Sequence, residues 1–132
     1  LSKRAMSCFN DRREKRVVSY DLRISVKIDG TDLYAQIATP ECDSPTYNLK
    51  ELFTKAMDWD FVQGEQYKCI EVIKNIEQGL RELLLNGKAY KQYEPGDGWG
   101  TALSAAEDLE SLRDCIHNTA EDIPMEHLYV AW

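Results

Sequence analysis

The sequence lacks any long apolar run. The segment Leu83-Leu84-Leu85 falls far short of the roughly 20 apolar residues that a membrane-spanning helix needs. No signal-peptide pattern is found at either end. We therefore expect a soluble, cytoplasmic protein without a membrane partner.

Closely spaced metal ligands are also missing. The four cysteines are Cys8, Cys42, Cys69 and Cys115, which form no Cys-x-x-Cys pair, and the chain has only 2 histidines. Zinc sites normally use ligands that lie closer together in the sequence. We expect no metal site and no cofactor, and we expect Cys69 and Cys115 to be buried, reduced thiols on the apolar faces of helices.

Positive charge is scarce beyond the N-terminal residues. The 132-residue chain has a formal net charge of −7, although residues 1–16 carry six basic side chains against two acidic ones. The rest of the chain is therefore strongly acidic. This disfavours nucleic acid as a partner, because neutralisation of phosphates by Lys and Arg supplies most of that affinity. We expect residues 1–18 to form a basic N-terminal arm, either native or outside the native domain, and residues 19–132 to form a single domain.

Both ends of this domain have strand patterns. Apolar and polar residues alternate from Tyr20 to Ile28, turn residues follow, and a second strand pattern ends at Thr39, which together predict an antiparallel hairpin. Leu128, Val130 and Trp132 alternate in the same way. They predict a last strand that joins the hairpin.

Three helices are predicted between these strands. A capping box of Asn48 and Glu51 opens the first helix, which ends near Trp59. The second helix extends from about Gly64 to Asn86 and is closed by Gly87; its apolar stripe is Ile70, Ile73, Ile76, Leu80, Leu83 and Leu84.

The third helix begins at Thr101 or at Ser104, and its apolar stripe is Ala105, Leu109, Leu112 and Ile116. The predicted element order is therefore ββαααβ. It indicates an α+β fold, in which three helices cover one face of a small, mostly antiparallel sheet.

A turn-rich loop precedes the third helix and carries several aromatic residues. It runs from Tyr93 to Thr101, with Trp99 at its tip. Four aromatic residues lie at the predicted helix ends: Tyr47, Tyr90, Tyr93 and Trp99. We expect them to gather with Gly100 at one edge of the fold. They either seal the helical layer, with Trp99 in the core, or bind a partner or a planar ligand.

No residue pattern identifies a catalytic site. The triplet Cys42-Asp43-Ser44 could supply a nucleophile, but no elbow motif or oxyanion donor accompanies it. Glycines at 96, 98 and 100 precede a helix, as in loops that bind phosphate, but the Lys and Ser or Thr of a Walker motif are missing. We name no catalytic residue, and we expect a protein that is not an enzyme.

Three short motifs carry a resemblance. They are Ser19-Tyr20-Asp21-Leu22, Thr46-Tyr47-Asn48 and the segment from Pro95 to Gly100. The order of these motifs is similar to that of short uncharacterised proteins carried by phages and integrative elements of Gram-positive bacteria. The resemblance implies a mobile-element origin, and by position it highlights Tyr47, Asn48, Trp99 and Gly100.

These observations lead to two functional hypotheses, with an enzyme that uses Cys42 as a third possibility. The first is a non-catalytic binding protein that acts by contact with a host or element protein. The second is a module that binds a nucleotide or another small planar ligand through the Trp99 loop.

Overall fold

Four strands form one antiparallel sheet in the computed structural model, which describes residues 19–42, 45–96 and 100–132. In sequence order they are β1 (Arg23–Lys27), β2 (Tyr34–Ala38), β3 (Tyr67–Lys68) and β4 (Leu128–Ala131), and their order across the sheet is β2-β1-β4-β3. Helices and strands are segregated along most of the chain. The predicted α+β class is confirmed.

The N-terminal hairpin and the C-terminal strand are paired as predicted. β1 pairs with β2, and its other edge pairs with β4, where Ile24 lies opposite Val130. The hairpin turn contains Gly30 at φ 76°, a left-handed conformation that favours glycine. Tyr20, Leu22 and Ile24 are buried, as the alternating pattern predicts, whereas Ile28 at the end of the pattern is 45% exposed and the polar Ser25 is only 2% exposed.

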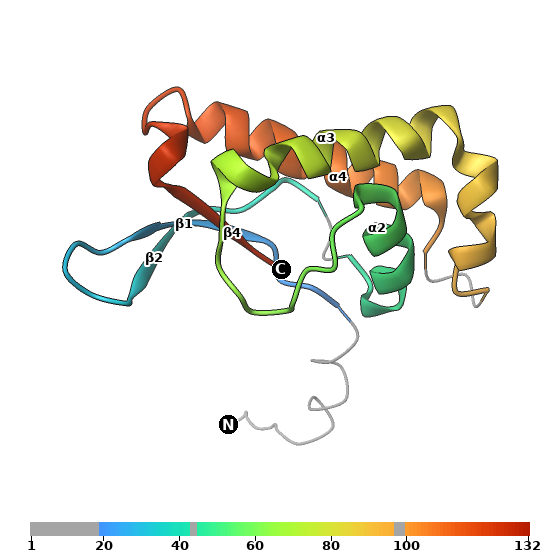
Figure 1. The fold of residues 1–132 in the computed structure, drawn as a ribbon, viewed down its shortest axis with the longest axis horizontal. Helices are drawn as coiled ribbons and strands as arrows, with labels where there is room; N and C mark the ends of the chain where they lie inside the picture. Colours follow the sequence, from blue (N-terminus) through green and yellow to red (C-terminus); the bar gives the residue numbers. More distant parts are fainter. Residues whose placement is uncertain (1–18, 43–44, 97–99) are drawn as a thin grey trace, which may run out of the picture.

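The helical elements are η1 (Tyr47–Leu49), α2 (Lys50–Met57), α3 (Cys69–Leu85), η2 (Gly87–Tyr93), α4 (Ala102–Thr119) and η3 (Met125–His127), where η denotes a 3₁₀-helix. Helices α3 and α4 run side by side on one side of the sheet (Figure 1). None of the helices in the described ranges is long and apolar enough to cross a lipid bilayer.

The start of the first helix differs from the predicted capping box. Thr46 is the N-cap: its Oγ1 accepts a hydrogen bond from the Asn48 N–H at 3.4 Å, which opens the short helix η1. The regular α-helix begins only at Lys50. It ends at Met57, where Asp58 has a left-handed backbone with φ 52°, so the predicted end near Trp59 is confirmed.

The predicted start of the second helix at Gly64 is wrong. Gly64 has φ 89°, and its N–H donates to the Trp132 carbonyl oxygen at 3.0 Å. Tyr67 then pairs with Val130. The segment before Cys69 is thus tied to the sheet, which gives the fourth strand, and α3 is five residues shorter at its start than predicted.

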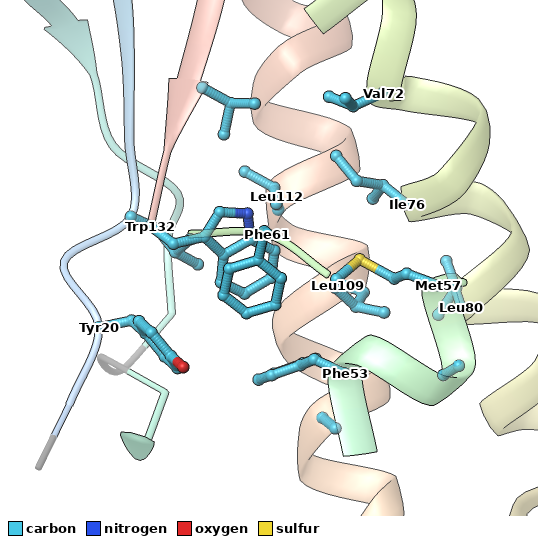
Figure 2. Packing of buried hydrophobic residues seen from close by; sticks show 14 of the residues in the cluster. Tyr20, Phe53, Met57, Phe61, Val72, Ile76, Leu80, Leu109, Leu112 and Trp132 are labelled. Atoms are coloured by element: carbon cyan, nitrogen blue, oxygen red, sulfur yellow. The ribbon is translucent and has the colours of Figure 1, made fainter. Parts of the chain in front are cut away.

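The core lies between the sheet and the helices, and aromatic side chains fill its centre (Figure 2). Trp132 contacts the rings of Tyr20, Phe53 and Phe61. The predicted stripe of α4 is confirmed, because all four of its members are fully buried: Ala105, Leu109, Leu112 and Ile116.

The predicted stripe of α3 is only partly buried. Ile76, Leu80 and Leu83 lie in the core, whereas Ile70 is 52% exposed and Leu84 is 62% exposed. The run Leu83-Leu84-Leu85 cannot place three successive side chains on one side of a helix with 3.6 residues per turn. Leu84 and Leu85 therefore lie on the solvent side.

Candidate functional site

The aromatic residues predicted at the helix ends lie on short 3₁₀-helices. Tyr47 begins η1, whereas Tyr90 and Tyr93 belong to η2. Gly100 directly precedes Thr101, the N-cap of α4. Trp99 lies outside the described residues.

Tyr47 is held against the aromatic core while much of its ring remains in solvent. Its ring centroid lies 5.1 Å from that of Tyr20, and its exposed fraction is 41%. Tyr20 itself is 1% exposed, and its N–H donates to the Pro45 carbonyl oxygen at 2.7 Å. Burial, with Tyr47 nearby, raises the pKa of the Tyr20 phenol well above its ordinary value. Tyr47 is thus an exposed ring on a rigid support.

Tyr90 and Tyr93 form a second, separate aromatic pair with ring centroids 6.2 Å apart. The Tyr90 hydroxyl donates to Glu82 Oε1 at 2.9 Å, and Lys55 Nζ lies 6.0 Å from the Tyr93 ring centroid. Partial burial and then the Glu82 hydrogen bond raise the pKa of Tyr90. These contacts join η2 to α3 and α2.

Gly100 is packed directly against η1. A Cβ atom at this position would lie 2.8 Å from Leu49 Cγ and 2.9 Å from both Leu49 Cδ atoms. Such distances are shorter than van der Waals contact, so the backbone approaches closely because residue 100 has no side chain. This contact places the start of α4 beside η1, the short helix that begins at Tyr47.

The structure therefore gathers the predicted residues into two groups and not into one cluster. Gly100 packs against Leu49 of η1, which begins at Tyr47, while Tyr90 and Tyr93 pack together on η2. No ring contact joins Tyr47 to either of these two tyrosines within the described part of the chain.

The N-terminus of α4 already has hydrogen-bond acceptors. Thr101 Oγ1 accepts from the Ser104 N–H at 3.0 Å, and Ser104 Oγ accepts from the Thr101 N–H at 2.9 Å. Glu94 Oε2 accepts from the Ala102 N–H at 2.7 Å. A phosphate at this helix end would meet the Glu94 carboxylate, so these contacts disfavour the phosphate-loop interpretation.

The thiols and histidines of the described residues do not form a nucleophile and base pair. Cys42 is half-buried beside a small hollow that Asp21, Leu22, Thr39, Pro40 and Pro45 also line. His117 Nε2 instead lies 3.3 Å from Glu77 Oε2 on α3. The Asp43 and Ser44 of the predicted triplet lie outside the described residues.

The two helical cysteines are free thiols. Cys69 is fully buried, as predicted, whereas Cys115 is half-buried. Desolvation raises the pKa of the Cys69 thiol to about 12, and it also raises that of Cys115. Neither is an activated thiolate, since activation requires a lowered pKa. In residues 19–42, 45–96 and 100–132, no three His, Cys, Asp or Glu side chains are grouped to hold a metal ion.

Sequence reasoning missed several exposed leucines on the helices. Leu84 and Leu85 border a hollow of about 510 Å³, which Glu77, Leu80, Arg81 and Arg113 also line. Leu85 is 73% exposed, and Leu103 on α4 is 66% exposed. The signal was the Leu83-Leu84-Leu85 run, which requires an apolar residue outside the core-facing stripe.

Comparisons with protein-family models, characterised proteins and solved structures found no match to this chain.

Proposed function

We propose that this chain is a non-catalytic binding protein of a mobile element, which acts in the cytoplasm by contact with a host or element protein. The observation that carries the proposal is Tyr47, a residue that is 41% exposed and whose ring centroid lies 5.1 Å from that of the buried Tyr20. Tyrosines of this kind are common among the residues that dominate protein interfaces. The order of the three short motifs supports the mobile-element origin.

Tyr47 is suited to this role because its position is fixed before binding. The ring rests on Tyr20, and the Thr46 cap and the contact between Leu49 and Gly100 hold the adjacent backbone. A side chain that is already ordered loses less conformational entropy when a partner binds. More of the free energy gained from its contacts with a partner therefore remains as binding affinity.

The experiment is affinity capture with the full chain from a lysate of its natural host. Tyr47→Ala and Trp99→Ala are tested in parallel, and Leu33→Ala, at a 65% exposed position on the hairpin, is the matched control. We expect a partner that the native chain and Leu33→Ala retain and that Tyr47→Ala loses. The free energy of unfolding of Tyr47→Ala should stay within about 1 kcal/mol of the native value, as is usual at exposed positions.

Two results would contradict the proposal. One is equal capture by the native chain and both aromatic variants. The other is a saturable change of tryptophan fluorescence on addition of nucleotides, lost in Trp99→Ala, which would favour the planar-ligand hypothesis. The carboxylate of Glu94 at the α4 N-terminus makes us expect no such change.

A further inference from the structure

Strand β2 forms one edge of the sheet, and its outer side has no neighbouring strand in the described part of the chain. The opposite edge strand, β3, has only 2 residues, whereas β2 has 5. At its turn end, the hairpin that carries β2 projects beyond the helical layer (Figure 1). The longer of the two sheet edges is therefore open to another strand.

Two residues of β2 direct their backbone N–H and C=O groups away from β1. The Ile28 N–H donates to the Leu33 carbonyl oxygen at 2.8 Å. In an antiparallel pair, positions that exchange hydrogen bonds alternate with positions that do not. The register that continues from this bond therefore turns the backbone groups of Tyr34 and Gln36 outward. Within the described ranges, no residue forms a hydrogen bond with these outward groups.

The side chains of this edge do not protect it from another strand. The stretch from Leu33 to Thr39 contains no charged residue, no proline and no glycine, in a chain in which 30% of the residues are charged. Leu33 is 65% exposed and Ile37 is 40% exposed. Natural edge strands are usually blocked by charge, by proline or by another element that covers them. A register shift beside Ile24 affects only the far end of the strand.

We infer that β2 pairs with β2 of a second copy of the chain, in antiparallel orientation and with Ala35 of one copy opposite Ala35 of the other. In this register Tyr34 of each copy lies opposite Gln36 of the other copy, so every outward N–H meets an outward C=O. Leu33 lies opposite Ile37 of the other copy, at a position where side chains approach each other closely. Such a twofold interface uses the same patch on both copies and is closed.

A second copy fits this edge better than an unordered peptide does. Its β2 is already extended because it pairs with β1, so little conformational entropy is lost when the two strands associate. Neither strand carries a charge, so no like charges lie opposite each other in the pair. A register centred on Gln36 would place Tyr34 opposite Ala38, where the register shift disturbs the alternation of backbone groups.

The test is the mass of the full chain in solution, measured by sedimentation equilibrium at several protein concentrations in about 0.15 M salt. We expect a concentration-dependent dimer with twice the 15.2 kDa chain mass. Gln36→Pro removes an outward N–H and leaves the bonds to β1 intact, and proline is tolerated at such edge positions. It should raise the dimer dissociation constant by about tenfold, because the twofold interface loses this bond twice. Gln36→Ala keeps the N–H and should remain dimeric.

A charge on the edge provides a second variant. Ile37→Lys places an ammonium group opposite Leu33 of the other copy and should give a monomer that still melts cooperatively, since lysine is common on natural edge strands. The matched control is Leu103→Lys, at a 66% exposed position on α4. This control should remain dimeric.

A cross-link tests the register of the two strands. The Cα atoms of residues that face each other without hydrogen bonds are about 4.5 Å apart, a separation that a disulfide can span. Ala35→Cys, treated with oxidised glutathione, should therefore form a covalent dimer that peptide mapping assigns to residue 35. The native chain, treated in the same way, gives the background from its own cysteines.

Three results would overturn the inference. The first is a native chain that is monomeric at all concentrations. The second is a dimer that Gln36→Pro and Ile37→Lys leave unchanged. The third is a dimer in which Ala35→Cys yields no cross-link above the background of the native chain.

Discussion

Phe61 lies nearly parallel to Trp132, with ring centroids 4.2 Å apart and an angle of 22° between the ring planes. Lys50 Nζ lies 3.7 Å from the Phe61 ring centroid and 3.1 Å from Asp60 Oδ1, and it donates to the Phe61 carbonyl oxygen. The loop between α2 and β3 is therefore fixed to the last residue of the chain. This stacked pair connects the sheet to the helical layer.

Replacing Trp132 with Ala should strongly destabilise the protein. Trp132 is 1% exposed, and its removal leaves a cavity bordered by Phe61 and Phe53. Substitutions of this type cost about 3–5 kcal/mol. Urea denaturation followed by far-ultraviolet circular dichroism measures the change, with Leu33→Ala as a control that should stay within about 0.5 kcal/mol. A loss below about 1 kcal/mol would contradict the role given to this ring.

Gly79→Ala should destabilise the protein although alanine favours helices. A Cβ atom at residue 79 would lie 2.5 Å from Met57 Cγ and 3.0 Å from Leu109 Cδ1. The gain in helix propensity is about 1 kcal/mol, and overpacking of a filled core costs about 1–3 kcal/mol. We expect a lower melting temperature. Gly87→Ala, where no atom lies within 4 Å of the added Cβ, should leave it unchanged or raised.

Gly100→Ala should loosen the contact between η1 and the start of α4. Its Cβ would collide with three atoms of the Leu49 side chain, with an expected cost of about 1–3 kcal/mol. Hydrogen exchange of amides in η1 and in the first turn of α4 should become faster than in the native chain. Unchanged protection in both segments would show that the Leu49 side chain moves aside at little cost.

Stability should fall in alkaline solution partly because of Cys69. Its folded-state pKa is raised to about 12, whereas an unfolded thiol titrates near pH 8.5. Between these values the unfolded chain loses a proton that the folded chain keeps, so rising pH favours unfolding by up to about 1.4 kcal/mol per pH unit. Below the unfolded pKa this contribution to stability is fully present.

The measurement is the free energy of unfolding from pH 8 to about pH 11, compared with that of Cys69→Ala. The variant is expected to be less stable at pH 8 because of lost packing, but its stability should decline less steeply. Parallel curves would show that the thiol of Cys69 does not titrate differently in the two states.

Sequence periodicity predicted the parts of the fold in which one face is buried against the core. The alternation around Ile24 and Val130 and the stripe around Leu109 fall in this class, because each pattern reports burial on one side. The short strand β3 could not be predicted in this way. Two residues are too few for a period, and Tyr67 lies in a strand only because β4, which is distant in the sequence, provides its hydrogen-bond partners.

The sequence predicted which residues lie at the helix ends but not which of them contact each other. Sequence reasoning placed Tyr47, Tyr90 and Tyr93 at helix ends, and the structure confirms those positions. Their division into two groups depends on the contact of Tyr47 with Tyr20 and of Tyr90 with Glu82. Local sequence patterns do not reveal these distant partners. The prediction wrongly placed the exposed Leu84 in the core, because residue spacing shows only approximately which direction a helical stripe faces.

The position of β4 in the sheet has a consequence for synthesis of the chain. β4 lies between β1 and β3, yet it is the last of the strands to leave the ribosome. The hairpin and the α3–α4 pair can form earlier from local contacts, but the sheet must wait until residue 131 emerges. Non-local pairing of this kind is slow to form. The nascent protein therefore exposes the aromatic core until translation of this segment is complete. During that interval, a chaperone that binds apolar segments would bind these exposed aromatic residues.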